Sequence, residues 1–167
     1  MTPGPPSSIN AKDEHWDCLS LAISHLIPIA NEFDVKLAFE THMRQLTDTL
    51  SGSKHLLEIA KSKTVGLTVD FSNLSFAGDK IEEVISELKG SIYNTHVKNG
   101  TVGDDGTWYF NALNNGLTDY NIVLKLLHQI GYNGYLTIEC LGQDAKDKPY
   151  ETAKRDLNIL LEYIKQI

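Results

Sequence analysis

The segment TVGLTVD, residues 64–70, decides the fold class of this chain. Its large apolar side chains, Val65, Leu67 and Val69, recur at every second position and therefore share one face. The opposite face carries a glycine, a threonine and, at the end of the segment, Asp70. Alternation with a period of two predicts a β-strand that has one face in the core. Asp70, the last residue of the strand, therefore lies on the face that points away from the core.

The same strand–helix unit repeats along the chain. Residues 1–12 are rich in Pro, Gly and Ser and are predicted to form an irregular lead-in. A helix and then alternating strands and helices follow, an order that predicts parallel strands joined by right-handed crossovers. The hydrophobic patterns place strands at 35–40, 64–70, 91–97 and 135–140, and helices at 13–33, 54–61, 79–88, 119–130 and 150–167.

Composition narrows the class of protein. The 167 residues suit one domain, and the net charge of −7 argues against a nucleic-acid partner, because phosphate binding needs a basic surface. The sequence contains no apolar run long enough for a membrane span and no signal peptide at its start. Two cysteines, Cys18 and Cys140, make no disulfide framework. We therefore expect a cytoplasmic protein without nucleic-acid or membrane partners.

Each predicted strand ends in an ionisable side chain. These are Glu40, Asp70, His96 and Glu139. Counting alternate positions back along each strand places the four on equivalent faces, and the carboxyl ends of parallel strands meet at one edge of a sheet. One such residue alone can be a turn residue or a helix cap, but four at matched positions predict a shared site.

The opposite faces of the strands distinguish two architectures. In the third strand the alternation groups His96 with Asn94 and Ile92, and in the other strands the larger apolar side chains face away from the ionisable residue. A sheet covered by helices on both sides needs two apolar faces. A barrel has its active site at the carboxyl ends of its strands and accepts polar side chains there, so the pattern favours a barrel wall.

The composition of the four residues predicts a metal site. Three carboxylates and one imidazole, without a thiolate, suit Mn²⁺ best, with Mg²⁺, Co²⁺ or Zn²⁺ as alternatives. Several residues near this edge are candidate substrate contacts: His42, Lys98, Asn73 and Trp108, with Arg44 and Tyr109 beside them. The other interpretation of His42, Lys98 and Arg44 is that they are exposed loop residues without a role, and it applies best to Arg44. The two aromatic residues either wall the pocket or pack on their own loop.

Four segments carry a resemblance to a known family. LAFETH (37–42), GLTVDFSN (66–73), YNTHVKN (93–99) and GYNGYLTIECLG (131–142) resemble the last four strands of the xylose isomerase-like TIM barrels, and Gly116 to Asp119 resembles the entry to their seventh helix. The resemblance covers residues 13–167. It implies an α/β fold of the (β/α)₈ TIM-barrel type, with only the last four β/α units present as a half-barrel of parallel strands.

The resemblance also implies a function. Glu40, Asp70, His96 and Glu139 fall on the four metal ligands of the family, and the two glutamates on its acid/base pair. A divalent-metal-dependent isomerase or epimerase of a sugar or sugar phosphate is the function expected, with proton transfer through an enediolate. The alternatives are a metal-dependent dehydratase of the inosose or dehydroshikimate type and a catalytically inactive half-barrel that serves as an interaction domain.

The chain departs from some branches of that family. Ketose 3-epimerases carry a histidine and an arginine where this chain has Asn73 and Val102. The endonuclease branch needs further histidines, and Asn73 and the acidic charge argue against it. A complete barrel has eight strands and about 250 residues. The expectation for a chain with four strands is a fragment of a longer protein, a homodimer that rebuilds the barrel, or a pairing with a separate N-terminal half.

Overall fold

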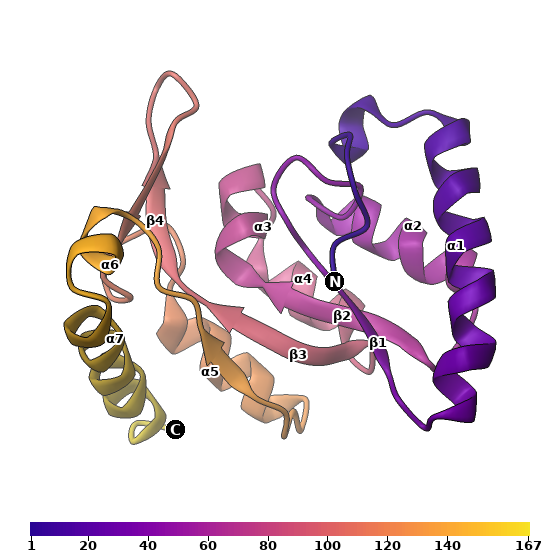
Figure 1. The fold of residues 1–167 in the computed structure, drawn as a ribbon. Helices are drawn as coiled ribbons and strands as arrows, with labels where there is room; N and C mark the ends of the chain where they lie inside the picture. The colour runs from indigo at the N-terminus through magenta and orange to yellow at the C-terminus, as the bar shows by residue number, and fades with distance from the viewer.

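A four-stranded parallel sheet forms the centre of the structure, a computed structural model that describes residues 1–167 (Figure 1). The strands lie in chain order, and all three pairings between neighbours are parallel. The prediction of four parallel strands is therefore confirmed. Their bounds are β1 (Leu37–Glu40), β2 (Val65–Asp70), β3 (Ile92–Val97) and β6 (Leu136–Ile138).

The five predicted helices are all present. In Figure 1, α1 and α2 lie at the β1 end of the sheet and α7 lies at the β6 end. Helix α2 begins four residues earlier than predicted, because the side chain of Thr49 accepts a hydrogen bond from the Gly52 amide and caps it. No helix is long and apolar enough to cross a membrane. The bounds are α1 (Asp13–Glu32), α2 (Leu50–Ala60), α4 (Ile81–Leu88), α5 (Tyr120–Gln129) and α7 (Pro149–Ile164), with two short elements, η1 (Ser8–Asn10) and α6 (Gln143–Asp147).

A helix and a hairpin near the carboxyl edge of the sheet occupy regions that the sequence pattern predicts as loops. Helix α3 (Phe71–Ala77) follows β2 directly, capped by the Asp70 side chain, which accepts from the Asn73 amide. The predicted long loop after β3 contains an antiparallel hairpin of β4 (Asn99–Val102) and β5 (Trp108–Asn111). Both elements are too short for a periodic pattern to reveal them, and both carry residues toward the carboxyl edge of the sheet.

A β-bulge corrects the predicted faces of the third strand. The pairing with β2 shifts between Leu67 and Thr68, so that Ile92 pairs with Leu67 while Asn94 pairs with Thr68. Ile92 therefore lies in the core, and the prediction that it shares a face with His96 is wrong. The ring of Tyr93 occupies the space beside Gly66, where a Cβ would come within 2.5 Å of it. The bulge reverses the alternation once, and His96 keeps its predicted face.

The core lies between the sheet and the helices. The apolar residues of β1 and β2 that alternate along the strands, among them Phe39 and Leu67, pack with the apolar faces of the helices. This confirms that the large apolar side chains face the helices. The opposite face is more open, and Tyr135, next to β6, is 81% exposed.

The lead-in lies along the first strand. Met1 donates from its amino group to the Ala38 carbonyl (3.1 Å), and its own carbonyl accepts from the Glu40 amide (2.8 Å). Farther on, the hydroxyl of Ser8 donates to Asp48 at 2.6 Å. Residues 1–12 are thus irregular, apart from η1, and held against the β1 side of the structure.

We expect Leu67→Ala to lower the free energy of unfolding by about 2–5 kcal/mol, because its side chain is fully buried in the centre of the sheet and its truncation leaves a cavity. The measurement is urea unfolding followed by circular dichroism. Leu21→Ala, at an exposed position of α1, is the control and should change stability by less than about 0.5 kcal/mol. Equal losses for the two variants would contradict the placement of the core.

Candidate active site

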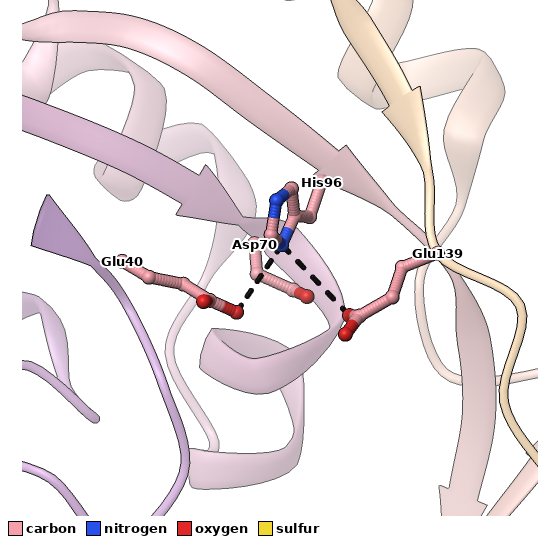
Figure 2. Close-up of side chains that lie close together, drawn as sticks. All are labelled: Glu40, Asp70, His96 and Glu139. Carbon is pink, nitrogen blue, oxygen red and sulfur yellow. Dashed lines mark hydrogen bonds and ion pairs between the residues drawn. The ribbon is translucent and has the colours of Figure 1, made fainter. Parts of the chain in front are cut away.

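Four ionisable side chains come together at the carboxyl edge of the sheet. Glu40 and Asp70 are the last residues of β1 and β2, His96 lies near the end of β3, and Glu139 directly follows β6. Each offers a potential ligand atom, and these atoms lie within 4.8 Å of one another. Figure 2 shows Glu40 and Glu139 reaching toward His96 from opposite sides, with Asp70 between them. The parallel register brings together residues that are separated by 99 positions of sequence at most.

His96 joins the two glutamates. Its Nδ1 lies 3.2 Å from Glu40 Oε1 and 3.8 Å from Glu139 Oε2. The hydrogen bond to Glu40 raises the pKa of His96 above its ordinary value, and burial opposes this only in part. Burial by itself would raise the pKa of Glu40, but the hydrogen bond to His96 and the nearby positive charges outweigh it, and the pKa is lowered. Without a metal ion, the pair therefore favours an imidazolium beside a carboxylate.

Lys98 belongs to this cluster. Its Nζ lies 2.9 Å from Asp70 Oδ2 and 2.7 Å from Glu139 Oε2, and the residue is only 5% exposed. Burial would lower the pKa of Lys98, but the two carboxylates outweigh it and raise the pKa. The interpretation of Lys98 as an exposed loop residue is wrong, because its side chain is buried and its ammonium lies between the carboxylates of Asp70 and Glu139. The ammonium of Lys98 thus binds two of the candidate ligands, Asp70 and Glu139, at the same time.

Asp70 is the most enclosed of the four. Its side chain is fully buried, and its Oδ1 accepts the Asn73 amide at 3.0 Å. Burial raises the pKa of this carboxyl, and the charge of Lys98 offsets the effect only in part. Oδ2 accepts no well-aligned hydrogen bond, so its ion pair with Lys98 is the interaction that compensates its burial.

A buried tyrosine fixes the backbone beside the cluster. The hydroxyl of Tyr120 donates to the Lys98 carbonyl at 2.6 Å and accepts from the Lys98 amide at 3.1 Å. Ser72 also donates to that carbonyl. Burial raises the pKa of Tyr120, which therefore stays a neutral donor. Nothing in the sequence pattern distinguishes Tyr120 from an ordinary residue in the first turn of a helix, so sequence reasoning missed this support.

The remaining predicted substrate contacts lie around the cluster. His42 is half-buried in the loop after β1, where its Nδ1 lies 2.9 Å from the Met43 carbonyl oxygen, and its charge acts on Glu40. Asn73 and Trp108 line one pocket together with Arg44. Arg44 packs over the Trp108 ring, with Cζ 4.6 Å from the ring centroid. Trp108 therefore walls a pocket, whereas Tyr109 beside it is exposed.

The donor set matches a hard divalent cation. Oxygen atoms and one imidazole nitrogen are the ligands that Mn²⁺, Mg²⁺ and Zn²⁺ take in proteins. With His96 neutral, as a metal ligand must be, three carboxylates against the single ammonium of Lys98 leave two negative charges in the cluster, which one divalent ion would neutralise. Asp70 and Glu139 share the single positive charge of Lys98, so the buried Asp70 carboxylate also fits a further cation.

The model of the family described as xylose isomerase-like TIM barrel matches residues 1–163. An inosose dehydratase from Clostridium perfringens is 23% identical over 155 residues, which are 84% of this chain and 52% of that protein. This chain thus spans about half the length of the curated relatives it matches.

Solved structures show the same fold. The crystal structure of the probable 3-DHS dehydratase AsbF from Bacillus anthracis matches with a TM-score of 0.81 at 18% identity, over 96% of this chain and 61% of that one. The crystal structure of IOLI protein with a zinc atom matches with a TM-score of 0.79 at 18% identity, over 94% of this chain and 59% of that one. At such identities the likeness is one of fold.

The ion pair of His96 predicts how the stability of the metal-free chain depends on pH. Because the folded state raises the pKa of His96 from 6.5, its stabilising contribution is complete below about pH 6.5 and is lost as the pH rises through the folded-state value. The free energy of unfolding is measured in urea with EDTA present, from about pH 6 to about pH 9. It should fall with rising pH in the wild type, and His96→Gln should remove part of that fall. His25→Gln, at an exposed site on α1, should leave the profile unchanged. A wild-type profile parallel to that of His96→Gln would refute the pairing.

Proposed function

Because the chain belongs to the xylose isomerase-like TIM barrel family, we propose that it forms the active site of a divalent-metal-dependent enzyme that acts on a sugar or polyol. The observation that carries the proposal is the placement of two glutamates on opposite sides of one cluster, with Asp70 and His96 completing a set of four ligand atoms within 4.8 Å. An enzyme that inverts the configuration at a carbon by proton transfer needs acid/base groups on both faces of that carbon, and two glutamates on opposite sides supply them.

Glu40, Asp70, His96 and Glu139 are the residues we assign to the metal. A bound divalent ion would polarise the carbonyl of a substrate and its neighbouring hydroxyl, which lowers the cost of removing the α-proton. Manganese remains our first choice of ion because the site is rich in oxygen, and the zinc atom of a structural neighbour keeps zinc as the second. Lys98 holds the carboxylates of Asp70 and Glu139 in place by its two ion pairs.

The two glutamates are assigned to proton transfer. One carboxylate removes the proton next to the substrate carbonyl, and the other group acts as the acid on the opposite side. If the acid protonates a hydroxyl at the next carbon, the C–O bond breaks, a C=C bond forms and water leaves, which is dehydration. If it returns the proton to carbon, the product is an isomer or epimer.

We place dehydration of a polyol ketone first. The curated relatives are inosose dehydratases, and this chain lacks the histidine and arginine that its resemblance to ketose 3-epimerases would require at Asn73 and Val102. Isomerisation or epimerisation of a sugar is the second candidate, because it uses the same two glutamates. The two activities differ in the fate of one proton.

The prediction that four strands form half of a barrel also remains a proposal. It is supported by the chain's span of about half its relatives, and by β1 and β6, which lie at the two ends of the sheet. A second copy of the chain or a separate N-terminal half would complete the wall around the site. Light scattering at several concentrations distinguishes a homodimer from a monomer.

Mn²⁺ binding measured by calorimetry tests the proposed site. We expect binding in the micromolar range, weakened at least about tenfold in Glu139→Gln and in His96→Ala, because each variant removes one ligand. Glu58→Gln and His25→Ala, at exposed positions of α2 and α1, are the matched controls and should bind as the wild type does. A folded chain that binds no divalent ion would overturn the proposal.

Turnover separates the two reactions. With Mn²⁺ present, an inosose should give an enone-type product with an absorbance change, while ketoses should not epimerise. Glu40→Gln should abolish the product signal. Epimerisation of a ketose without any dehydration would reverse the order of the two candidates.

A further inference from the structure

A pocket of about 220 Å³ lies beside the four-residue cluster. The loop after β1, helix α3 and the start of β5 form its wall, and we call it the Arg44 pocket. Its polar lining includes Arg44, Asp48 and Asn73, and its apolar lining includes Phe76 and Trp108. The pocket has no part in the metal assignment, so its own chemistry must explain its polar groups.

Asn73 carries an acceptor that the protein leaves unpaired. The side chain is 1% exposed, and its Nδ2 donates to the Thr41 carbonyl at 2.9 Å. Because that carbonyl can only accept, the amide orientation is determined and Oδ1 is the atom that remains without a donor. This oxygen is buried beneath its neighbours and out of reach of a ligand, so Asn73 shapes the pocket wall without offering that acceptor.

Asp48 presents an acceptor in the same pocket. The residue is nine-tenths buried, and its Oδ1 accepts both the amide and the hydroxyl of Ser8, at 3.0 and 2.6 Å. Its Oδ2 forms no hydrogen bond or ion pair within the chain. A carboxylate at this position repels an anionic ligand and accepts from a hydroxyl.

Arg44 supplies the donors. Its guanidinium makes no ion pair and no hydrogen bond with the protein, and packing over the Trp108 ring holds it in the pocket wall. The backbone of Arg44 adopts a left-handed conformation, with φ of 60°, which is unusual for a residue with a side chain. The pocket therefore combines one free donor group, the Arg44 guanidinium, with one free acceptor, Asp48 Oδ2.

The strand β5 joins the pocket to the metal cluster. Trp108 and Phe110 share one face of this strand, about 7 Å apart. The exposed Arg44 packs on the Trp108 ring, and the Phe110 ring lies 5.6 Å from Lys98 Nζ, which contacts Asp70 and Glu139. The backbone amide of Asn73 also donates a hydrogen bond to Asp70 Oδ1, while the Asn73 side chain lines the pocket.

We propose that the Arg44 pocket binds the hydroxyl groups of a neutral sugar or polyol and excludes the phosphorylated form. Hydroxyls donate to Asp48 Oδ2 and accept from Arg44, so a neutral polyol satisfies both groups. A phosphate dianion has no proton for the Asp48 carboxylate and is repelled by its charge. The inference rests on the proposed function for its substrate class and names the uncharged member of that class.

Binding of myo-inositol and of myo-inositol 1-phosphate tests the proposal on the unaltered chain. Calorimetry is done with EDTA present, so the result does not depend on metal binding. We expect myo-inositol to bind and its phosphate to bind at least about tenfold more weakly. Equal or tighter binding of the phosphate would overturn the proposal and identify an anion pocket, and absence of binding by either compound would overturn the subsite itself.

Variants locate the binding in the pocket. Arg44→Gln should weaken the binding of myo-inositol about fivefold, because hydrogen bonds are lost. Asp48→Asn still accepts from Ser8 and should reduce the preference for myo-inositol over myo-inositol 1-phosphate. Lys89→Gln, which removes one positive charge at an exposed position after α4, is the control and should change neither value. Unchanged binding in both pocket variants would contradict the location. Loss of Mn²⁺ binding with intact myo-inositol binding would instead count against the proposed function alone.

Discussion

A buried ammonium between two carboxylates is the interaction on which the rest of the site depends. Lys98 lies within hydrogen-bonding distance of both Asp70 and Glu139, and removal of such a partner from a buried pair leaves a charge without compensation, which costs several kcal/mol. The ammonium of Lys98 also determines the net charge that the cluster presents to a metal ion. With Lys98 in place the four-residue cluster keeps two negative charges, and with His96 protonated it keeps one. The fold therefore builds an anionic site whose charge suits a further cation.

The backbone around Lys98 explains how that charge is held. Strand β3 delivers His96 to the carboxyl edge of the sheet, and the chain then turns into the hairpin of β4 and β5. Tyr120 bonds to both backbone groups of Lys98, from a helix 22 residues later in the chain. The bulge in β3 changes which side chain faces the core near Gly66, yet it leaves His96 opposite Asp70 in the register. Rigid elements thus position the charged groups, as a catalytic site requires.

Two neighbouring regions of one edge supply different chemistry. The four-residue cluster offers anionic ligands for a cation, and the Arg44 pocket offers hydrogen-bonding groups for an uncharged polyol. The hairpin links them, because one face of β5 packs on Lys98 through Phe110 and on Arg44 through Trp108. A substrate held at both places would have one end activated and the other end recognised. This division of tasks is common in enzymes that use remote binding energy to orient a reacting group.

The sequence by itself determined the strand–helix order, the core face of the sheet and the four ionisable residues at the strand ends, because alternation with a period of two is a local property of the chain. It also predicted Asn73 and Trp108 as substrate contacts, which stays a prediction. Only the tertiary structure decided that Ile92 belongs to the core, that Lys98 is buried among the carboxylates and that Arg44 stacks on Trp108. A bulge depends on the partner strand, and the direction of a long side chain depends on which distant groups surround it. Those are contacts between residues far apart in sequence, and no local pattern records them.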